Sequence, residues 1–413
     1  MSIFITPEDV IRELANLRQI TFETTELCNL HCKYCFYGDF YIDSSDRKGN
    51  DINIKSALNL LDYLIPLWNS EYNMSDHAVL YVSFYGGEPL LNFDFIEKIT
   101  LYLSNLKLSN RDIKFTITTN ATLLDKYMHF LVKNNFDIYI SLDGNEYNNS
   151  YRLKKNGEPS FFKVCENIDK IRISFPDFFT SNVHFNSVLH NRNSIEDIYN
   201  FFHRNYNKLP SIGELNTVGI RDDKAKQFKK TYKKYDDNGT VNNDLVNDES
   251  LLYSTKYKSL IHFLYNSKGL SFNDYSDLMF EKNNKAKRIP TGTCLPFSRK
   301  MFVSAYGDIL PCEKIGLEHT LGHVNENSVD INVEAIAATY NNYLNDIFMN
   351  QCNSCCNQAC GSCIFCLKFI DGRPHCNNYM DLQTFEIYKD KQIDILRGNP
   401  SLYFNIMKNI KFK

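Results

Sequence analysis

The sequence predicts an α/β fold made of repeated strand–helix units, followed by a separate cysteine-rich module. Residues 20–220 alternate between strand and helix patterns, the expected strands are almost continuously apolar, and nine of the thirteen cysteines fall after residue 291. Strands that are apolar on both faces are typical of parallel sheets covered by helices. Repeated units of this kind imply right-handed crossovers, in a doubly wound sheet or in a full or partial barrel.

Six strands with helices between them are expected in order along the first half of the chain. The expected strands cover residues 20–23, 79–84, 113–118, 138–142, 183–189 and 212–218. The expected helices cover residues 54–67, 93–106, 123–132, 161–173 and 195–202. Each helix carries an apolar stripe at helical spacing, which would cover one face of the sheet. A polar, lysine-rich stretch follows, and residues 251–265 are expected to form an amphipathic helix.

Composition limits the compartment and the partners. The chain has 413 residues and a net charge of −3, which gives no reason to expect nucleic acid as a partner. Its N-terminus lacks the pattern of a signal peptide, and no apolar window is long enough to span a bilayer, so no membrane association is expected. We therefore expect a cytoplasmic protein, in which clustered cysteines are metal ligands and not disulfides.

Three cysteines, Cys28, Cys32 and Cys35, follow the first expected strand in the spacing CxxxCxxC. Three thiolates can hold three irons of a [4Fe–4S] cube and leave the fourth iron open to another ligand. A structural zinc site, the alternative, needs four protein ligands, and no fourth ligand stands at a suitable spacing.

Polar motifs stand at the ends of the next three strands. The sequence Gly86-Gly87-Glu88-Pro89 ends the second strand, where two glycines allow close approach of the backbone to a ligand. Glu88 can either anchor this turn or accept from an ammonium group. The third strand ends in Thr118-Thr119-Asn120 and the fourth in Ser141-Leu142-Asp143-Gly144. Small hydroxyls and a carboxamide at such strand ends suit hydrogen bonds to a small polar ligand.

The C-terminal cysteines form a second pattern. Cys294 and Cys312 stand in the arrangement Cys-x12-Gly-x4-Cys. They are followed by Cys352, Cys355, Cys356, Cys360, Cys363, Cys366 and Cys376. Cysteine pairs two residues apart are also found in zinc ribbons, so zinc is the alternative for this module.

From about residue 20 to 379, these motifs together resemble radical S-adenosylmethionine (SAM) enzymes that carry a C-terminal SPASM extension. The resemblance implies a partial (β/α)6 TIM-type barrel followed by a small cysteine-rich iron–sulfur domain, with active residues at the carboxyl ends of the strands. It divides the chain into an N-terminal extension (1–19), the barrel (20–220), a bridging region (221–290), the SPASM auxiliary-cluster domain (291–385) and a tail (386–413).

The resemblance also implies the cofactors and the residues that bind them. Cys28, Cys32 and Cys35 would hold the [4Fe–4S] cluster whose open iron is chelated by SAM. The residues expected to bind SAM are Tyr34, Gly86, Gly87, Glu88, Pro89, Asn120, Ser141, Asp143, Arg152, Asn186 and Leu189. Among them, Arg152 is the expected partner of the methionine carboxylate, because a guanidinium fork matches that group.

A SPASM extension implies two auxiliary [4Fe–4S] clusters. We assign Cys294, Cys312 and Cys366 to the first. The second is assigned Cys352, Cys355, Cys360 and Cys376. Cys356 and Cys363 remain as substitute ligands, because the spacing differs from the usual SPASM pattern.

Enzymes of this kind generate a 5′-deoxyadenosyl radical, and we expect this one to oxidise or crosslink side chains of a ribosomally synthesised peptide. The alternative is an anaerobic sulfatase-maturating enzyme, which forms formylglycine. Those enzymes carry an acidic residue directly after the cysteine of Gly-x4-Cys, where this chain has Glu313. Glu313 is therefore the candidate catalytic base, although it could equally form a surface pair with Lys314.

The expected partners are a precursor peptide or protein substrate and an electron donor such as a flavodoxin or ferredoxin. Only about twenty residues precede the first strand, too few for a leader-binding domain. We therefore expect leader recognition to use a separate protein or a surface such as the lysine-rich segment 224–234.

Overall fold

The computed structural model describes residues 4–41, 47–74, 78–108, 111–217, 219–233, 295–313, 315–348, 350–356, 367–370, 373–376 and 379–398. Its internal contacts divide the chain into two units. The barrel unit consists of Leu14–Asn238 and Phe297–Asn332. The C-terminal unit consists of Met1–Glu13, Gly239–Pro296 and Val333–Lys413, so the first residues of the chain belong with its last part.

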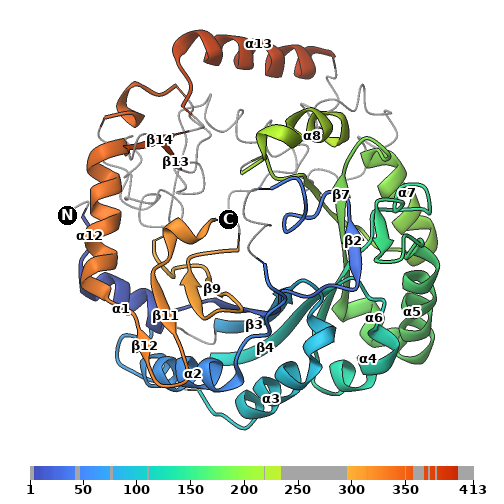
Figure 1. Cartoon of the computed structure of the whole chain (residues 1–413), viewed down its shortest axis with the longest axis horizontal. Coiled ribbons are helices and arrows are strands. Elements are labelled where there is room, and N and C mark those ends of the chain that lie inside the picture. The colour runs from blue at the N-terminus through green and yellow to red at the C-terminus, as the bar shows by residue number, and fades with distance from the viewer. Residues whose placement is uncertain are drawn as a thin grey trace. The chain divides into compact units, whose positions relative to one another are not determined.

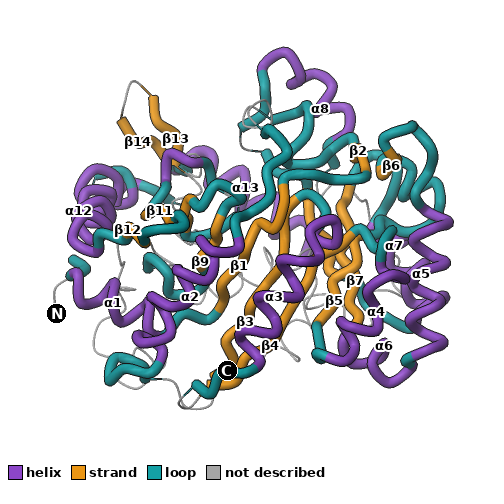
Figure 2. The backbone as a smooth tube through the Cα atoms, turned by 60° about the horizontal axis from the view of Figure 1, so that its bottom comes forward, coloured by secondary structure: helices purple, strands orange, loops and turns teal. Residues whose placement is uncertain are grey.

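Six parallel strands form the centre of the barrel unit, as the sequence predicts. They are β1 (Gln19–Thr25), β3 (Ala78–Gly86), β4 (Arg111–Thr119), β5 (Asp137–Ser141), β7 (Val183–Leu189) and β8 (Ser211–Glu214). Each strand pairs in parallel with the next in this order, and Figure 2 shows β1, β3, β4, β5 and β7 lying side by side. The mixed α/β class with a mostly parallel sheet is confirmed. The last strand is shorter than the expected 212–218.

Helices fill the crossovers between these strands, on the outer side of the sheet in Figure 1. They are α2 (Ile54–Trp68), α3 (Phe93–Ser104), α4 (Leu124–Lys133), α5 (Phe161–Ser174), α6 (Pro176–Asn182) and α7 (Ile195–Tyr206). All but α6 were expected within a few residues. Their ends follow local signals: the Ser194 hydroxyl accepts from the Asp197 N–H at the start of α7, and Asn207 ends it with a φ of 50°.

Four further strands extend this sheet beyond β1. β9 (Met301–Val303) pairs in parallel with β1, and β10 (Asp308–Leu310), β11 (Gly322–Val324) and β12 (Val329–Asp330) continue antiparallel to a total of ten strands. A lone β1 edge would leave backbone N–H and C=O groups unpaired, which explains the added strands. The barrel unit therefore includes residues 297–332, and the expected domain boundaries stay a prediction.

The C-terminal unit contains the remaining long helices. Its elements are α12 (Val333–Tyr343), η7 (Leu344–Phe348), η8 (Cys352–Ser354), the hairpin β13 (Leu367–Ile370) and β14 (Arg373–Cys376), and α13 (Leu382–Gly398). Asn341 joins the start of the chain to α12 by exchanging two hydrogen bonds with the Ile5 backbone, at 2.9 and 2.8 Å.

The shorter elements are α1 (Pro7–Ala15), β2 (Leu30–Cys32), η2 (Pro89–Asn92), β6 (Arg152–Lys154), η3 (Asp222–Lys224), α8 (Ala225–Thr231) and η6 (Leu317–His319). The amphipathic helix expected over residues 251–265 lies outside the described residues. So do Cys294, Cys360, Cys363 and Cys366. Within the described part of the chain, every helix is too short or too polar to cross a bilayer.

Candidate functional site

The loop after β1 carries the three cysteines, and two neighbouring segments hold it in shape. β2, which ends at Cys32, pairs antiparallel with β6, so that Cys32 faces Arg152 in the ladder. The Cys35 N–H donates to the Cys32 carbonyl at 3.1 Å and closes a turn between these two ligands. The Gly38 N–H donates to the Cys35 carbonyl at 2.8 Å. One turn thus joins Cys32 to Cys35, and a second follows directly after the motif.

The three thiols share a half-buried environment. Burial raises the pKa of Cys28 to about 11 and that of Cys32 to about 12, and each thiol also feels the charge of Cys35. Cys28 Sγ accepts a hydrogen bond from the Leu30 N–H at 3.4 Å. Such thiols stay protonated unless a metal takes the place of the proton. Three neighbouring thiols with an N–H donor on sulfur fit the cysteine side of a [4Fe–4S] cluster.

No group of three or more His, Cys, Asp or Glu side chains closes around a single metal ion among the residues that the structure describes. In a cube each cysteine binds a different iron, so its ligands do not converge on one point.

The glycines of Gly86-Gly87-Glu88-Pro89 allow β3 to approach the cysteine loop closely. A Cβ on Gly86 would lie 2.4 Å from the Thr25 carbonyl oxygen, and one on Gly87 would lie 2.1 Å from the Leu27 carbonyl oxygen. Gly86 also has a φ of 128°, which only glycine adopts readily. The backbone that these glycines approach is therefore the start of the cysteine loop itself. Contact of these glycines with SAM stays a prediction, as does contact of buried Pro89, the first residue of η2.

Glu88 anchors this turn. Its side chain is completely buried, and it accepts from the Leu90 N–H at 3.2 Å, from the Thr119 hydroxyl at 2.6 Å and from the Asn120 N–H at 2.7 Å. Burial raises the pKa of Glu88 to about 7, although these three donors oppose the shift. These three contacts support the anchor role, and acceptance from an ammonium group stays a prediction.

Asn120, the residue directly after β4, is hydrogen-bonded to the cysteine loop. Its Nδ2 donates to Asn29 Oδ1 at 2.9 Å and lies 3.8 Å from Cys28 Sγ. Its Oδ1 accepts from the Thr122 hydroxyl at 2.6 Å, and Asn29 Nδ2 donates to the same hydroxyl oxygen at 2.8 Å. The Asn120 carboxamide thus binds the cysteine loop through Asn29, and its expected contact with SAM stays a prediction.

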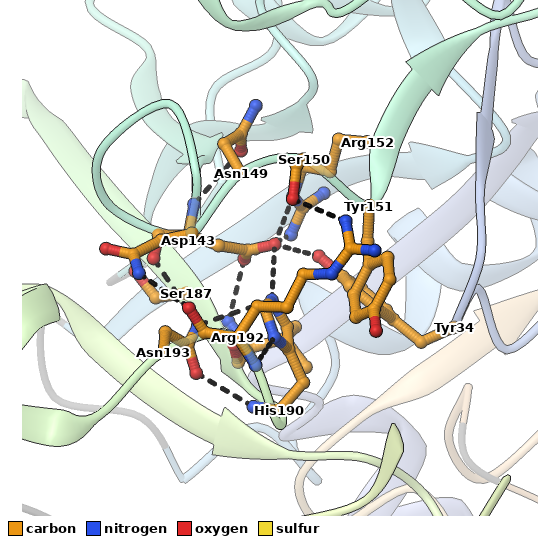
Figure 3. A network of polar contacts seen from close by, with 12 residues as sticks. Tyr34, Asp143, Asn149, Ser150, Tyr151, Arg152, Ser187, His190, Arg192 and Asn193 are labelled. Carbon is orange, nitrogen blue, oxygen red and sulfur yellow. Dashed lines mark hydrogen bonds and ion pairs between the residues drawn. The ribbon is translucent and has the colours of Figure 1, made fainter. Parts of the chain in front are cut away.

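Asp143 and Arg152 form a buried ion pair next to this loop (Figure 3). Arg152 Nε and Nη2 each donate to a different carboxylate oxygen of Asp143, both at 3.0 Å. The Tyr34 hydroxyl donates to the same carboxylate. Burial alone would raise the pKa of Asp143, but the Arg152 charge and the contact with His190 hold it well below its usual range. Three residues expected to bind SAM are therefore bound to one another, and their contacts with SAM stay predictions.

The other expected SAM residues lie on β5 and β7. Ser141 is half-buried and faces Asn186 across the parallel pair of β5 and β7. Asn186 is also half-buried, so both side chains retain exposed surface, Ser141 at the end of β5 and Asn186 in the middle of β7. Leu189 is completely buried and belongs to the core, which is what a core strand alone would also require. Its expected packing on adenine stays a prediction.

Glu313 follows β10 and is joined to Lys300, the residue before β9. Its carboxylate forms an ion pair with Lys300 Nζ at 2.9 Å, and both side chains are about one-fifth exposed. Lys314, the expected surface partner, lies outside the described residues. Tyr85, at the carboxyl end of β3, lies close enough to feel the charges of both Glu313 and Cys35, which add to burial in raising its pKa. β9 pairs Met301 with Ile20, so Lys300, the ion-pair partner of Glu313, is level with the start of β1. The expected place of Glu313 at the barrel mouth stays a prediction.

Four described cysteines, Cys352, Cys355, Cys356 and Cys376, belong to the C-terminal unit, whereas Cys312 belongs to the barrel unit. Gln351, just before η8, accepts from the Cys376 N–H at 3.1 Å and so joins β14 to the turn of Cys352 and Cys355. Cys355 Sγ accepts from the Met380 N–H at 3.4 Å. Three of the four cysteines assigned to the second auxiliary cluster are thus held by neighbouring segments.

The sequence did not reveal three buried charged or aromatic groups of the site. Glu23, on β1, accepts from the Ala305 N–H at 3.0 Å and pairs with Arg47 at 2.8 Å. Tyr85 and His190 stand at the carboxyl ends of β3 and β7. The one sequence signal for these two residues was their place at the end of an apolar run, because the carboxyl ends of barrel strands face the active site.

Comparison with known proteins agrees with this geometry. Residues 22–204 match the family model described as Radical SAM superfamily. The chain is 36% identical over 145 residues to an uncharacterized protein of Methanocaldococcus jannaschii, covering 35% of this chain and 45% of that one. It is 24% identical over 386 residues to the radical SAM cyclopropyl synthase TigE of Paramaledivibacter caminithermalis, covering 90% and 72%. It is 28% identical over 323 residues to a cysteine-type anaerobic sulfatase-maturating enzyme of Clostridium novyi, covering 72% and 74%.

Solved structures share the fold. The structure described as native anSMEcpe with bound AdoMet superposes with a TM-score of 0.57 at 17% identity, covering 95% of this chain and 100% of that one. The same protein with bound AdoMet and the Cp18Cys peptide gives 0.54 at 18% identity, covering 95% and 99%. A radical SAM fold implies SAM and a [4Fe–4S] cluster as cofactors. Since the family match runs from β1 into α7, with the cysteine loop and the strand-end motifs inside it, residues 22–204 form a radical SAM domain and this chain is an enzyme.

Proposed function

We propose that this enzyme is a radical SAM/SPASM maturase that oxidises or crosslinks side chains of a ribosomally synthesised peptide. The similarity to TigE supports the proposal, because a match over 90% of the chain takes in the barrel and most of the C-terminal cysteines. The sequence pattern of those cysteines, which resembles a SPASM extension, supports it independently.

Cys28, Cys32 and Cys35 would hold the cluster, and half-buried Ser141 and Asn186 would line the SAM pocket. When bound, SAM and the reduced cluster supply a 5′-deoxyadenosyl radical that removes a hydrogen atom from the substrate. The chain's own part is to hold the three thiols in one loop. The turns of the loop and its supports from β3 and β4 do this.

The observation that carries the proposal is the partly buried carboxylate of Glu313, which is held by Lys300 and whose charge reaches Tyr85 at the carboxyl end of β3. Forming a crosslink removes two hydrogens from the substrate, one as an atom and the other as a proton with an electron. Glu313 would accept that proton, since it is partly buried and held by Lys300. Tyr85, whose pKa is raised by burial and by the charges of Glu313 and Cys35, would lie beside the substrate.

The C-terminal cysteines would bind two auxiliary [4Fe–4S] clusters, which would accept the electron. The hydrogen bond between Gln351 and the Cys376 N–H supports the grouping of Cys352, Cys355 and Cys376 in the second cluster. Cys312 would serve the first cluster.

Formylglycine formation is the second candidate function. The 28% identity to the sulfatase-maturating enzyme of Clostridium novyi and the acidic residue after Cys312 favour it. In that case the substrate would be a cysteine or serine of a sulfatase.

Mass spectrometry separates the two functions. The enzyme, prepared without oxygen, is incubated with SAM, dithionite and either a short peptide encoded beside its gene or a cysteine-containing sulfatase peptide. Loss of two hydrogens from the first peptide, with fragments that stay linked, is the expected result. An aldehyde on the second peptide that reacts with a hydrazine would establish formylglycine formation instead. If 5′-deoxyadenosine forms and neither peptide changes, the proposed substrates are wrong.

A further inference from the structure

A buried polar network around Asp143 connects β5 and β7 to the cysteine loop (Figure 3). Besides Arg152 and Tyr34, the Asp143 carboxylate accepts from the Val188 N–H at 2.9 Å, and His190 Nε2 lies 3.6 Å from it. Asp143 and His190 are both completely buried. The carboxylate therefore has a partner from the cysteine loop, from β6, from β7 and from the residue after β7.

Two points of this network touch the cysteine loop. Tyr34 lies between Cys32 and Cys35, and its hydroxyl donates to Asp143. Arg152 faces Cys32 directly in the ladder of β2 and β6. A shift of the Asp143 carboxylate would therefore reach the cysteine loop at Tyr34 and, through Arg152, at the backbone of Cys32.

His190 completes the support of Asp143. Its Nδ1 accepts from the Arg192 N–H at 3.1 Å, which assigns the proton of the neutral ring to Nε2, the atom that faces Asp143. Its ring lies against Tyr34, with centroids 5.4 Å apart, and against Tyr151, at 4.9 Å. The same histidine therefore packs on the tyrosine and faces the carboxylate that binds the tyrosine hydroxyl.

We propose that Asp143 is a positioning residue for the cysteine loop: supported by Arg152 and His190, it acts through the Tyr34 hydroxyl to hold the loop in its cluster-binding shape. The inference rests on the proposed assignment of the cluster to Cys28, Cys32 and Cys35. Groups that bind and orient metal ligands from outside are worth roughly 10- to 100-fold in metal affinity. Arg152 uses two of its nitrogens on Asp143, so the pair brings no net charge to the loop.

The test compares two tyrosines of the same aromatic cluster. Tyr34 and Tyr151 are both buried, lie edge to face at 6.2 Å and donate their hydroxyls to side-chain oxygens, but Tyr151 donates to Asn191 and not to Asp143. Full-length Tyr34→Phe and Tyr151→Phe, loaded with iron and sulfide, are measured for the rate of iron loss to a chelator. The electron paramagnetic resonance spectrum of the reduced cluster is recorded with and without SAM.

Tyr34→Phe is expected to lose iron about tenfold faster than the wild type and to change the spectrum, whereas Tyr151→Phe should match the wild type. A wild-type rate and spectrum for Tyr34→Phe, or equal changes in both variants, would overturn the proposal. His190→Leu should change the rate of iron loss and the spectrum in the same way as Tyr34→Phe. His190→Gln keeps an N–H donor toward Asp143, so its spectrum should match that of the wild type.

A triple Cys28, Cys32 and Cys35 to Ala variant separates this inference from the assignment that it rests on. A SAM-responsive spectrum that survives in the triple variant would show that the cluster was assigned to the wrong cysteines. If that spectrum is lost while Tyr34→Phe behaves as the wild type, the assignment holds and only the positioning role fails.

Discussion

Replacing Glu88 with alanine should destabilise the barrel unit substantially, because its carboxylate joins the ends of two strands. Glu88 accepts from Leu90 N–H, Asn120 N–H and the Thr119 hydroxyl, and its side chain is completely buried. The hydroxyl can turn to another acceptor, but the two N–H groups cannot. A buried donor left without an acceptor costs about 1–3 kcal/mol, so we expect a loss of about 4 kcal/mol in the free energy of unfolding.

Urea unfolding of the anaerobically purified protein measures this loss. Trp68 is the only tryptophan of the chain and is completely buried, so its fluorescence reports unfolding of the barrel unit. With a urea slope of about 3 kcal/mol per M, the midpoint should fall by about 1 M. Glu166→Ala is the matched control, since Glu166 lies exposed on α5 in an ion pair with Lys170, and its midpoint should stay unchanged.

An unchanged midpoint in Glu88→Ala would contradict the anchor role of Glu88. If Glu88→Ala keeps the wild-type midpoint and iron content but binds SAM more weakly, Glu88 acts on the ligand and not on the turn. A loss of stability together with faster loss of iron would agree with the bonds from Glu88 to Asn120 and from Asn120 to the cysteine loop.

Three further predictions concern the metal, the base and pH. Replacing Cys28, Cys32 and Cys35 together with alanine should remove about four irons per chain and abolish 5′-deoxyadenosine formation, and unchanged iron would contradict the assignment. Glu313→Gln should leave SAM cleavage intact and stop product formation, so full product yield by mass spectrometry would exclude its role as base. Burial raises the pKa of Glu88 to about 7 from 4.5, so its contribution to stability is complete below pH 4.5 and is lost as the pH rises through 7. The urea midpoint should therefore fall between about pH 5 and pH 8 in the wild type and less in Glu88→Gln, and equal slopes would contradict this assignment.

The sequence alone determined the strand–helix order of the barrel and the places of its motifs. Apolar periodicity is a local signal, and it located five of the helices and all six strands within a few residues. The motifs could also be placed, since parallel strands bring their carboxyl ends to one edge. That rule put Glu88, Asn120 and Asp143 at the same end as the cysteine loop before any contact was known.

The tertiary structure alone decided what each of these polar groups binds. Asp143 lies 109 residues from Tyr34 along the chain and is hydrogen-bonded to it, and Lys300 pairs with Glu313 across a strand connection. No periodicity encodes such pairs, because they depend on which strands are neighbours and on the register between them. The pairing of β9 with β1 could not be predicted for the same reason. An open strand edge accepts any segment whose backbone can reach it, so the side chains of β9 do not specify this pairing.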